Sequence, residues 1–512
     1  MRQVEFTRLD MSTRRALPLI VSGTLLVVFL IVTKEHGLGV SHDSIFYARA
    51  AQSLLDDGML QVPITWWDTE ARYQPLSRWP PLLSITLALF SGLFDTDPIA
   101  AGRLLNAICI FFTSFMLLSL TSRTLCSFCL MAAFLLGETF LIAYLWLFSE
   151  PLFFFLIVLS FWVGLSAVNK ETDYWSFVFL ALLCGLATLT RYAGIFLWPA
   201  YIGLVFLQNK TWGIKAKQAV IYSGVYLAVL TPWLIYQSAV GGLHRTLGIF
   251  MDGFWEDIRG DMIPTIIHWI LPKWLPGELE VPIFMAGCIV FLMTVVWNFR
   301  RPQYFNLSAF SALALFLVYL ATILLARAAD PEIPLNYRTL APAYIYLALG
   351  LAYFSESIVK ERHSVVAGVV ITILASYLVL HNARSSVPRL IHAAEHGRGY
   401  ATEVWSQSET LSWLRTLPTN VTIFSNVPDA ICSYLPVAAK FTPRLDEISK
   451  LAEFENRVKE TAPSVVVLFD DWHNWDEPWL VSRDALINFL PKDNVTKFRD
   501  GIAISWDNSP HN

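Results

Sequence analysis

Charged side chains are scarce in this sequence: only 15% of its 512 residues are Asp, Glu, Lys or Arg. Soluble globular proteins carry about a quarter of such residues. Here 55% of the chain is hydrophobic, and the mean hydropathy is +0.50. A water-soluble fold cannot bury that much apolar surface, so a soluble enzyme is excluded. The 37 basic and 41 acidic residues leave a net charge of -4, which excludes nucleic-acid binding through bulk positive charge.

Cysteine is also rare, with six residues in the whole chain. Cys432 stands alone in the polar C-terminal part, so a disulfide framework within that part is excluded. Cys126 and Cys129 have the spacing of a redox or zinc pair, but no second pair or histidine cluster accompanies them. We therefore interpret these two cysteines as residues that pack in a membrane helix.

The sequence contains instead a succession of apolar runs of bilayer-spanning length. The first run, 16–33, follows Arg14 and Arg15 and leads directly into polar sequence, without the cleavage site of a signal peptide. We interpret it as an uncleaved anchor with a cytoplasmic N-terminus. Ten further spans are expected at 99–121, 125–146, 150–168, 174–190, 194–208, 218–237, 281–298, 304–326, 338–355 and 364–382. This total of about eleven helices places the C-terminus on the outer side of the membrane.

The charges of the loops agree with this topology, because cytoplasmic loops favour Lys and Arg. Lys215 and Lys217 fall in an expected cytoplasmic loop, whereas the first outer loop, 34–98, is rich in Asp and Glu. The apolar run 80–94 is short for a membrane span, and counting it as one would place the basic loops outside. We interpret it as an interfacial helix on the outer leaflet.

The predicted fold class is a polytopic α-helical membrane protein with a small C-terminal α/β domain outside the membrane. Residues 1–382 form the expected transmembrane domain, whose outer loop 34–98 carries the candidate active site. Residues 383–512 form the expected soluble domain. Within it, strands are expected at 421–425, 464–469 and 502–506, and helices at 402–415 and 446–460.

Asp43 is the first candidate for chemistry, because it lies just after the first span, in the first turn of a helix that Ser41 could cap. It could be a surface carboxylate that the helix dipole favours. It could also be a general base placed where a lipid-borne substrate presents its reacting carbon. The residues alone favour the surface carboxylate and leave the general base open.

Five motifs together resemble a known family. They are Ser41-His-Asp-Ser-Ile-Phe-Tyr47, Arg78-Trp-Pro-Pro-Leu82, Ser149-Glu-Pro-Leu-Phe153, Leu189-Thr-Arg-Tyr-Ala-Gly194 and Ile423-Phe-Ser-Asn-Val-Pro-Asp429. In this order they are similar to motifs of the C-class (GT-C) membrane glycosyltransferases, in particular the lipid A aminoarabinose transferases and the protein O-mannosyltransferases. The resemblance spans most of the chain.

This resemblance implies a glycosyltransferase that moves a sugar from a polyprenyl-phosphate carrier to a glycan, lipid or protein acceptor outside the membrane, with inversion at the anomeric carbon. It implies Asp43 as the catalytic base, with Glu150 assisting. The residues expected to bind substrate or phosphate are Tyr47, Arg78, Arg191, Tyr192 and Arg338. No cofactor or metal and no nucleic acid is expected, and the expected location is a bacterial inner membrane.

The sequence departs from the family at two places. Relatives commonly have two adjacent acids in the first outer loop, whereas this chain has His42 before Asp43. Relatives have Lys before the paired prolines, whereas this chain has Trp79, with Arg78 one place earlier. Only Asp43 therefore corresponds to the family's catalytic carboxylate.

Simpler explanations exist for the charged residues near the membrane, where ionisable groups are costly. Glu150 before Pro151 suits a helix start, and Arg191 could reach the interface as an extended side chain. Arg327, Asp330 and Arg338 could form an interfacial ion network or a second phosphate clamp. The alternative function is a transporter or flippase of a lipid-linked substrate, although we see no inverted repeat in the sequence.

Overall fold

The computed structural model describes residues 9–169, 173–241, 250–299, 306–362, 365–470, 480–490 and 494–506. The chain divides into two compact units. The helical unit comprises Met1–Val32 and Leu105–His392, and the sheet unit comprises Thr33–Leu104 and Ala393–Asn512.

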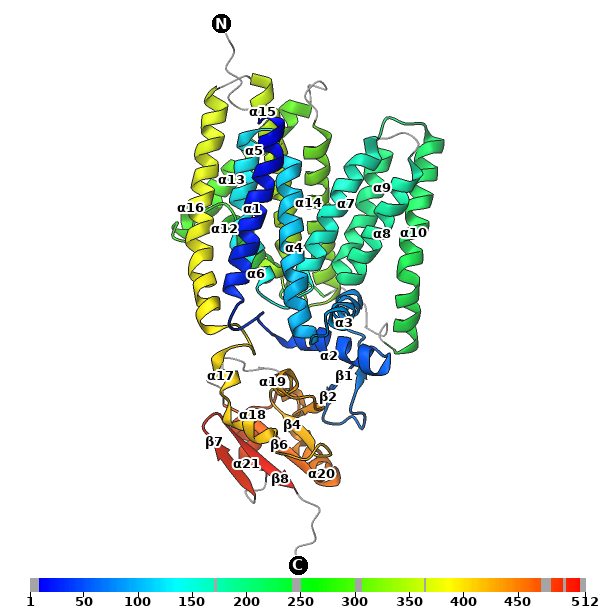
Figure 1. Ribbon diagram of the computed structural model, residues 1–512, viewed down its shortest axis with the longest axis vertical. Helices are drawn as coiled ribbons and strands as arrows, with labels where there is room; N and C mark the ends of the chain where they lie inside the picture. The colour runs from blue at the N-terminus through cyan, green and yellow to red at the C-terminus, as the bar shows by residue number, and fades with distance from the viewer. Residues whose placement is uncertain are drawn as a thin grey trace, which may run out of the picture. The chain divides into compact units, whose positions relative to one another are not determined.

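The helical unit is built from long apolar helices whose axes run in a common direction in Figure 1. In chain order they are α1 (Met11–Val32), α4 (Pro98–Thr121), α5 (Leu125–Leu135), α6 (Glu138–Tyr144), α7 (Glu150–Asn169), α8 (Tyr174–Thr190), α9 (Leu197–Phe206), α10 (Trp212–Ala239), α13 (Gly277–Phe299), α14 (Leu307–Ala329), α15 (Tyr337–Arg362) and α16 (Val365–His396). Two short helices, α11 (Phe254–Asp257) and α12 (Ile263–His268), precede α13.

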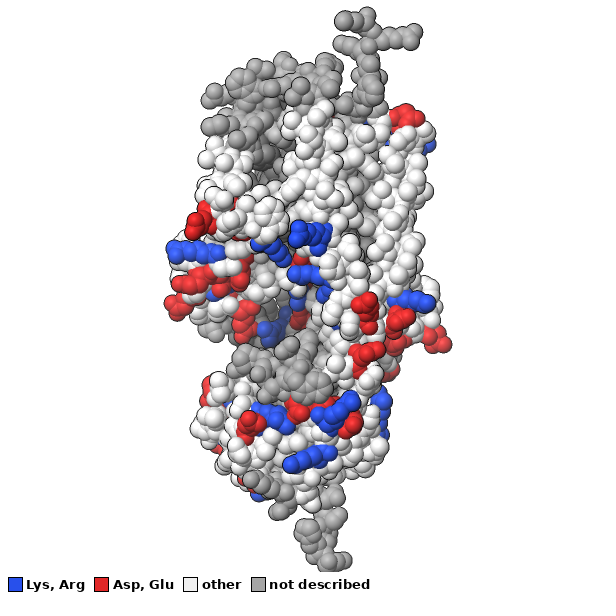
Figure 2. All heavy atoms as spheres, turned by 90° about the vertical axis from the view of Figure 1, so that its left-hand side faces the viewer, with Lys and Arg blue, Asp and Glu red and all other residues white. Residues whose placement is uncertain are grey.

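Five helices in the described part of the chain are long and apolar enough to cross a membrane: α1, α4, α7, α10 and α14. The pair α5 and α6, bent by 55°, gives a sixth span if the two count as one. On the face shown in Figure 2, much of the helical surface lacks charged side chains. An integral membrane protein is therefore confirmed. In the described residues the expected spans coincide with helices, 125–146 with both α5 and α6, but the number of eleven crossings stays a prediction.

The helices pack pairwise, α14 on α15, α7 on α8 and α8 on α10. A cluster of fully buried tyrosines lies among them, including Tyr201, Tyr222 and Tyr346. A Cβ on Gly164 of α7 would lie 2.5 Å from the ring of Tyr201, which belongs to α9. The close approach of α7 and α9 therefore requires glycine at position 164.

The sheet unit combines a mostly parallel sheet with helices on both of its faces. Its helices are α2 (His42–Asp57), α3 (Leu82–Phe94), α17 (Glu403–Ser406), α18 (Glu409–Leu414), α19 (Pro428–Tyr434), α20 (Leu451–Glu460) and α21 (Arg483–Phe489). Its strands are β1 (Gln61–Val62), β2 (Ile64–Trp66), β3 (Gln74–Pro75), β4 (Thr422–Ser425), β5 (Ala439–Phe441), β6 (Ser464–Phe469), β7 (Val495–Phe498) and β8 (Gly501–Trp506).

The six-stranded sheet has the order β2-β5-β4-β6-β8-β7. The first four strands are parallel, and β8 and β7 add antiparallel to β6 and to each other. β6 is buried along its whole length because helices cover both faces, as is usual for a parallel strand. Phe454 and Val458 of α20 pack on one face. Residues of α18 and α19, such as Leu411 and Ile431, pack on the other.

The first outer loop folds with the C-terminal part of the chain rather than with the membrane helices, where the sequence placed it. β2 forms parallel pairs with β5, and Val62, Ile64 and Leu76 lie in the same apolar core as Ile423. Strands of two or three residues carry too little periodicity to be recognised, so the sequence does not reveal this pairing.

The three expected strands are present as β4, β6 and β8, with ends shifted by one residue at most. The helix expected at 402–415 is two helices, because the Ser408 hydroxyl accepts the N–H of Leu411 at 3.0 Å and starts α18 afresh. The last long helix, α16, continues to His396, beyond its expected end at 382.

Candidate functional site

Asp43 lies where the sequence expects it, in the first turn of α2. The Ser44 hydroxyl accepts the N–H of Ser41 at 3.0 Å and helps to start this helix. The opposite face of α2 is apolar and buried, with Ile45, Phe46 and Ala50 in the core of the sheet unit. This packing fixes the position of α2. Asp43 lies at the start of the helix and is half-buried.

Trp79 positions the Asp43 carboxylate. Its indole N–H donates to Asp43 Oδ1 at 3.2 Å, and its ring lies 4.3 Å from that of Phe46 and 6.5 Å from that of Tyr47, centroid to centroid. The guanidinium of Arg78 lies 5.6 Å from the centre of the same ring. The structure therefore brings Asp43, Tyr47 and Arg78 together around the indole of Trp79.

A second carboxylate lies close to this group. The imidazole Nδ1 of His42 is 2.7 Å from Oδ2 of Asp429, and the Asp429 side chain is only 2% exposed. Asp429 comes from the first turn of α19, in the motif that ends the series resembling the family. Sequence reasoning missed this pair, because 387 residues separate its two members.

In the helical unit, one glutamate binds two arginines. Glu150 Oε1 lies 2.8 Å from Arg191 Nη1 and 3.0 Å from Arg338 Nε. Glu150 is 1% exposed, whereas the side chains of the two arginines are 19% and 27% exposed. We call Glu150, Arg191 and Arg338 the arginine cluster.

The starts of α7 and α15 and the end of α8 supply the arginine cluster. Glu150 starts α7, and Arg191 follows the end of α8 in an extended conformation. The chain turns sharply there, since a Cβ on Gly194 would lie 2.7 Å from the backbone nitrogen of Thr188. At α15, the Asn336 side chain accepts the N–H of Arg338 at 3.0 Å and so caps the helix at its first turn.

The arginine cluster presents two guanidiniums at a partly buried place. Two guanidiniums face one carboxylate, and Arg338 also lies 3.6 Å from the centre of the Phe148 ring. Arg191 Nη1 makes a further hydrogen bond to Ser149 Oγ at 3.1 Å. Planar guanidiniums bind phosphate through paired N–H groups, so this arrangement suits an anionic ligand.

Other expected residues have different surroundings. The Tyr192 hydroxyl turns to α10 and accepts the indole N–H of Trp233 at 3.1 Å. Arg327 is buried and binds Asp257 at 2.6 Å, which connects α14 to α11. The Asp330 carboxylate accepts the N–H of Glu332 at 3.0 Å. The interfacial network expected between Arg327, Asp330 and Arg338 stays a prediction.

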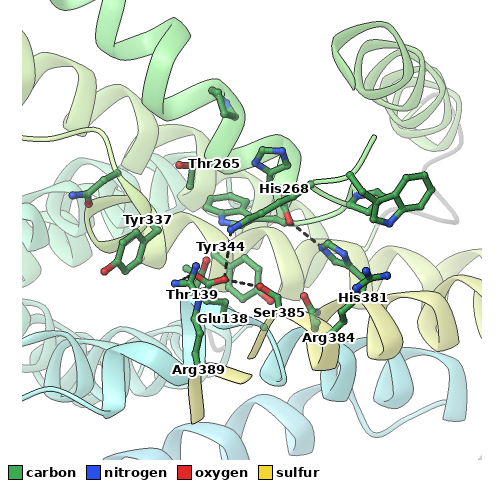
Figure 3. A pocket seen from close by; sticks show the side chains of 18 of the residues that line it. Glu138, Thr139, Thr265, His268, Tyr337, Tyr344, His381, Arg384, Ser385 and Arg389 are labelled. Carbon is green, nitrogen blue, oxygen red and sulfur yellow. Dashed lines mark hydrogen bonds and ion pairs between the residues drawn. The ribbon is translucent and has the colours of Figure 1, made fainter. Parts of the chain in front are cut away.

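A cavity of about 820 Å³ opens within the helical unit between α6, α12, α15 and α16. Figure 3 shows Glu138, Ser385 and Arg389 turned toward one another on its wall. Glu138 accepts a hydrogen bond from Ser385 at 2.6 Å, pairs with Arg389 and lies 3.7 Å from Lys273. The expected site residues do not line this cavity, although its wall reaches Tyr337, the residue before Arg338. We look to the arginine cluster, which contains two of the expected phosphate-binding residues, for the binding of an anion.

Within the described residues, no group of three or more His, Cys, Asp or Glu side chains could hold a metal ion.

The expected site residues form two groups. Asp43, Tyr47 and Arg78 belong to the sheet unit, and Glu150, Arg191 and Arg338 belong to the helical unit.

Comparisons with known proteins identify the fold. No protein-family model and no curated protein sequence matches the chain. Among solved structures it is similar to the oligosaccharyltransferase AglB from Archaeoglobus fulgidus in complex with an inhibitory peptide and a dolichol-phosphate. The TM-score is 0.53 at 13% identity, with 90% of this chain and 70% of AglB covered.

A second AglB structure, tethered to an acceptor peptide, gives a TM-score of 0.52 at 12% identity, with 90% of this chain and 70% of that chain covered. ArnT from Cupriavidus metallidurans in the apo state gives 0.47 at 12% identity, with 95% and 97% covered. At such identities the AglB likeness is one of fold. AglB is a GT-C glycosyltransferase, so the resemblance inferred from the five motifs is confirmed at the level of the fold.

Proposed function

We propose that this chain is a membrane glycosyltransferase that moves a sugar from a polyprenyl-phosphate carrier to an acceptor hydroxyl on the outer face of the membrane. The observation that carries the proposal is the arginine cluster. The side chains of Arg191 and Arg338 lie 2.8 and 3.0 Å from one buried glutamate, and both are partly exposed, at 19% and 27%. Guanidiniums held in place in this way can offer paired N–H groups to a phosphate.

A polyprenyl phosphate carries such a phosphate group, and it is also the leaving group of the proposed reaction. As the bond between the sugar and the phosphate breaks, negative charge develops on the phosphate oxygen. Arg191 and Arg338 stabilise that charge, and Glu150 holds both guanidiniums in place. Arg78 is a further candidate for phosphate contact in the sheet unit.

Asp43 is the proposed base. Its carboxylate takes the proton of the acceptor hydroxyl while the oxygen attacks the anomeric carbon. The hydrogen bond from Trp79 orients this carboxylate. A single displacement inverts the configuration of the anomeric carbon.

The fold supports this proposal. AglB was solved with a dolichol-phosphate, a lipid phosphate of the kind proposed here as carrier. The acceptor is a glycan, a lipid or a protein, and the location is the inner membrane of a bacterium, with the N-terminus in the cytoplasm and residues 383–512 outside.

The experiment compares Asp43→Asn with the wild type. Purified full-length protein in detergent receives radiolabelled polyprenyl-phosphate mannose, glucose or arabinose, together with an extract of envelope lipids and glycans as acceptor. Release of polyprenyl phosphate is followed by thin-layer chromatography. We expect Asp43→Asn to lower the rate by about 10²- to 10⁴-fold, because Asn keeps the shape but cannot accept a proton.

Asp56→Asn is the matched control. Asp56 lies on the same helix, where its carboxylate accepts hydrogen bonds from Gln52 at 2.9 and 3.0 Å. This variant should keep the wild-type rate. Equal activity of Asp43→Asn and Asp56→Asn would exclude Asp43 as the base.

A further inference from the structure

His42 and Asp429 form a hydrogen-bonded pair in which the carboxylate is buried. Asp429 is buried, and the ring of His42 is its hydrogen-bond partner at 2.7 Å. The other oxygen, Oδ1, makes no hydrogen bond to the described residues. A carboxylate buried in this way depends on the imidazole for its stabilisation.

This contact determines how His42 can act. A hydrogen bond to the carboxylate places a proton on Nδ1 and orients Nε2 as the basic nitrogen. The Asp429 carboxylate also stabilises the imidazolium that forms when Nε2 takes up a proton. The His42 side chain is 32% exposed, so protons can leave it for solvent.

Three aromatic rings hold the imidazole. Its centroid lies 4.6 Å from that of Phe46, 5.7 Å from that of Trp79 and 6.2 Å from that of Phe441. The same Trp79 donates its indole N–H to Asp43 at 3.2 Å. His42 and Asp43 therefore contact one indole and follow one another at the start of α2.

We propose that His42, held by Asp429, receives the acceptor's proton from Asp43. The inference rests on the proposed glycosyl transfer and deepens it. Asp43 takes the hydroxyl proton as the oxygen–carbon bond forms and the carbon–phosphate oxygen bond breaks, with the bonding pair leaving on the phosphate. The proton then passes to His42 Nε2, directly or through a water molecule, and the imidazolium releases it to solvent. One proton is released for each sugar transferred.

Base strength explains why a second acceptor is useful. Aspartate titrates near pH ~3.9 and histidine near ~6.5 in model peptides, so an imidazole is the stronger base at neutral pH. General-base catalysis is most effective when the base titrates near the working pH. A carboxylate can contact the acceptor hydroxyl and then pass the proton to an imidazole. The pair thus combines the position of the carboxylate with the greater base strength of the imidazole.

A purely structural role is the rival explanation. Arg49 of α2 donates to the carbonyl oxygens of Cys432 and Leu435 at the end of α19, so α2 and α19 are already joined at a second point. The charged groups on the elements around the imidazole are Asp43, Arg49, Asp56 and Asp57 on α2, Asp429 on α19, Arg78 beside Trp79 and Lys440 on β5. The pH dependence of the variants must therefore distinguish a role of His42 in proton transfer from a role in joining α2 to α19.

The decisive measurement is the pH profile of kcat/KM for release of polyprenyl phosphate, using the polyprenyl-phosphate sugar on which the wild type is most active. The wild type should lose activity at acidic pH, where a protonated imidazole can no longer accept the proton. His42→Gln can still donate a hydrogen bond to Asp429 but cannot titrate. We expect kcat/KM of this variant to be lower by about tenfold or more at pH 7. We also expect the loss of activity at acidic pH, which we call the histidine limb, to be absent.

The matched control is His36→Gln. His36 Nε2 donates to the carbonyl oxygen of Glu395 at 3.1 Å, so it also joins the first outer loop to the C-terminal part, but to a neutral group. This variant should keep both the rate and the histidine limb. An unchanged limb in His42→Gln would overturn the proposal and leave docking as the role of His42.

Chemical rescue keeps the proposal testable if His42→Gln folds poorly. His42→Ala should regain activity as imidazole is added, because free imidazole replaces the missing base. Asp43→Asn should not respond to imidazole. Failure of imidazole to rescue a folded His42→Ala would also overturn the proposal, whereas a wild type without any transfer activity would instead refute the proposed function.

Discussion

Replacing Glu150 by Gln tests the arginine cluster, because the substitution keeps the side-chain shape and removes only the charge. In the wild type the carboxylate is 1% exposed and binds Arg191 at 2.8 Å and Arg338 at 3.0 Å. In Glu150→Gln two positive guanidiniums face a neutral amide. The fold should lose stability, and the affinity of the cluster for phosphate should rise.

The magnitude follows from the burial. Removing one partner of a buried ion pair costs about 3–5 kcal/mol, and the partly exposed arginines place this variant at the lower end. A loss of about 3 kcal/mol changes the unfolding equilibrium constant roughly a hundredfold. The opposite sign for phosphate binding distinguishes a ligand-binding cluster from an ion pair that serves stability alone.

Two assays on the purified protein in detergent measure these effects. Unfolding by dodecyl sulfate is followed by tryptophan fluorescence, and binding of polyprenyl phosphate by titration calorimetry. Glu356→Gln is the control, because Glu356 is equally buried and lies 3.8 Å from the exposed Arg123, outside the arginine cluster. It should leave phosphate binding unchanged. A Glu150→Gln variant within about 1 kcal/mol of the wild type, or one with weaker phosphate binding, would refute the reasoning.

Further predictions concern single side chains. Arg191→Lys should lose phosphate affinity nearly as much as Arg191→Ala, because lysine lacks the paired N–H groups; a fully active lysine variant in the transfer assay would exclude the clamp. Trp79→Phe keeps the ring but removes the donor to Asp43, so turnover should fall about tenfold or more at little cost in thermal stability; an unchanged rate would show that this hydrogen bond does not orient the base. Burial raises the pKa of the Cys432 thiol to about 12, so at pH 8 it should resist a maleimide until the chain is unfolded, as mass spectrometry of the labelled peptide can check. A cysteine at Lys450 should be labelled from outside intact cells and one at Lys215 only after permeabilisation; labelling of position 450 only from inside would reverse the proposed topology.

Sequence reasoning located the helices and several site residues because their signals are local. Apolar runs of span length predict α1, α4 and α7, and the acid before Pro151 predicts a helix start. These patterns depend on neighbouring residues alone. The expected positions of Asp43 and Glu150 at helix starts are therefore confirmed.

Contacts between distant segments could not be predicted in this way. The pairing of β2 with β5 joins residues 64–66 to 439–441, and each strand is too short to show a period. His42 and Asp429 are likewise far apart in the sequence, and neither has a local pattern that indicates its partner. The convergence of Arg191 and Arg338 on one carboxylate was missed for the same reason.

The measurement that tests the central claim most directly is the release of polyprenyl phosphate by the wild-type protein in detergent, where no membrane gradient or sidedness exists. The account predicts that a polyprenyl-phosphate sugar is converted to polyprenyl phosphate and an inverted glycoside when acceptor is present, and not when Asp43 is replaced by Asn. No release from any of the donors with envelope lipids, glycans and proteins as acceptors would contradict the account and favour a transporter of the same lipid-linked substrate.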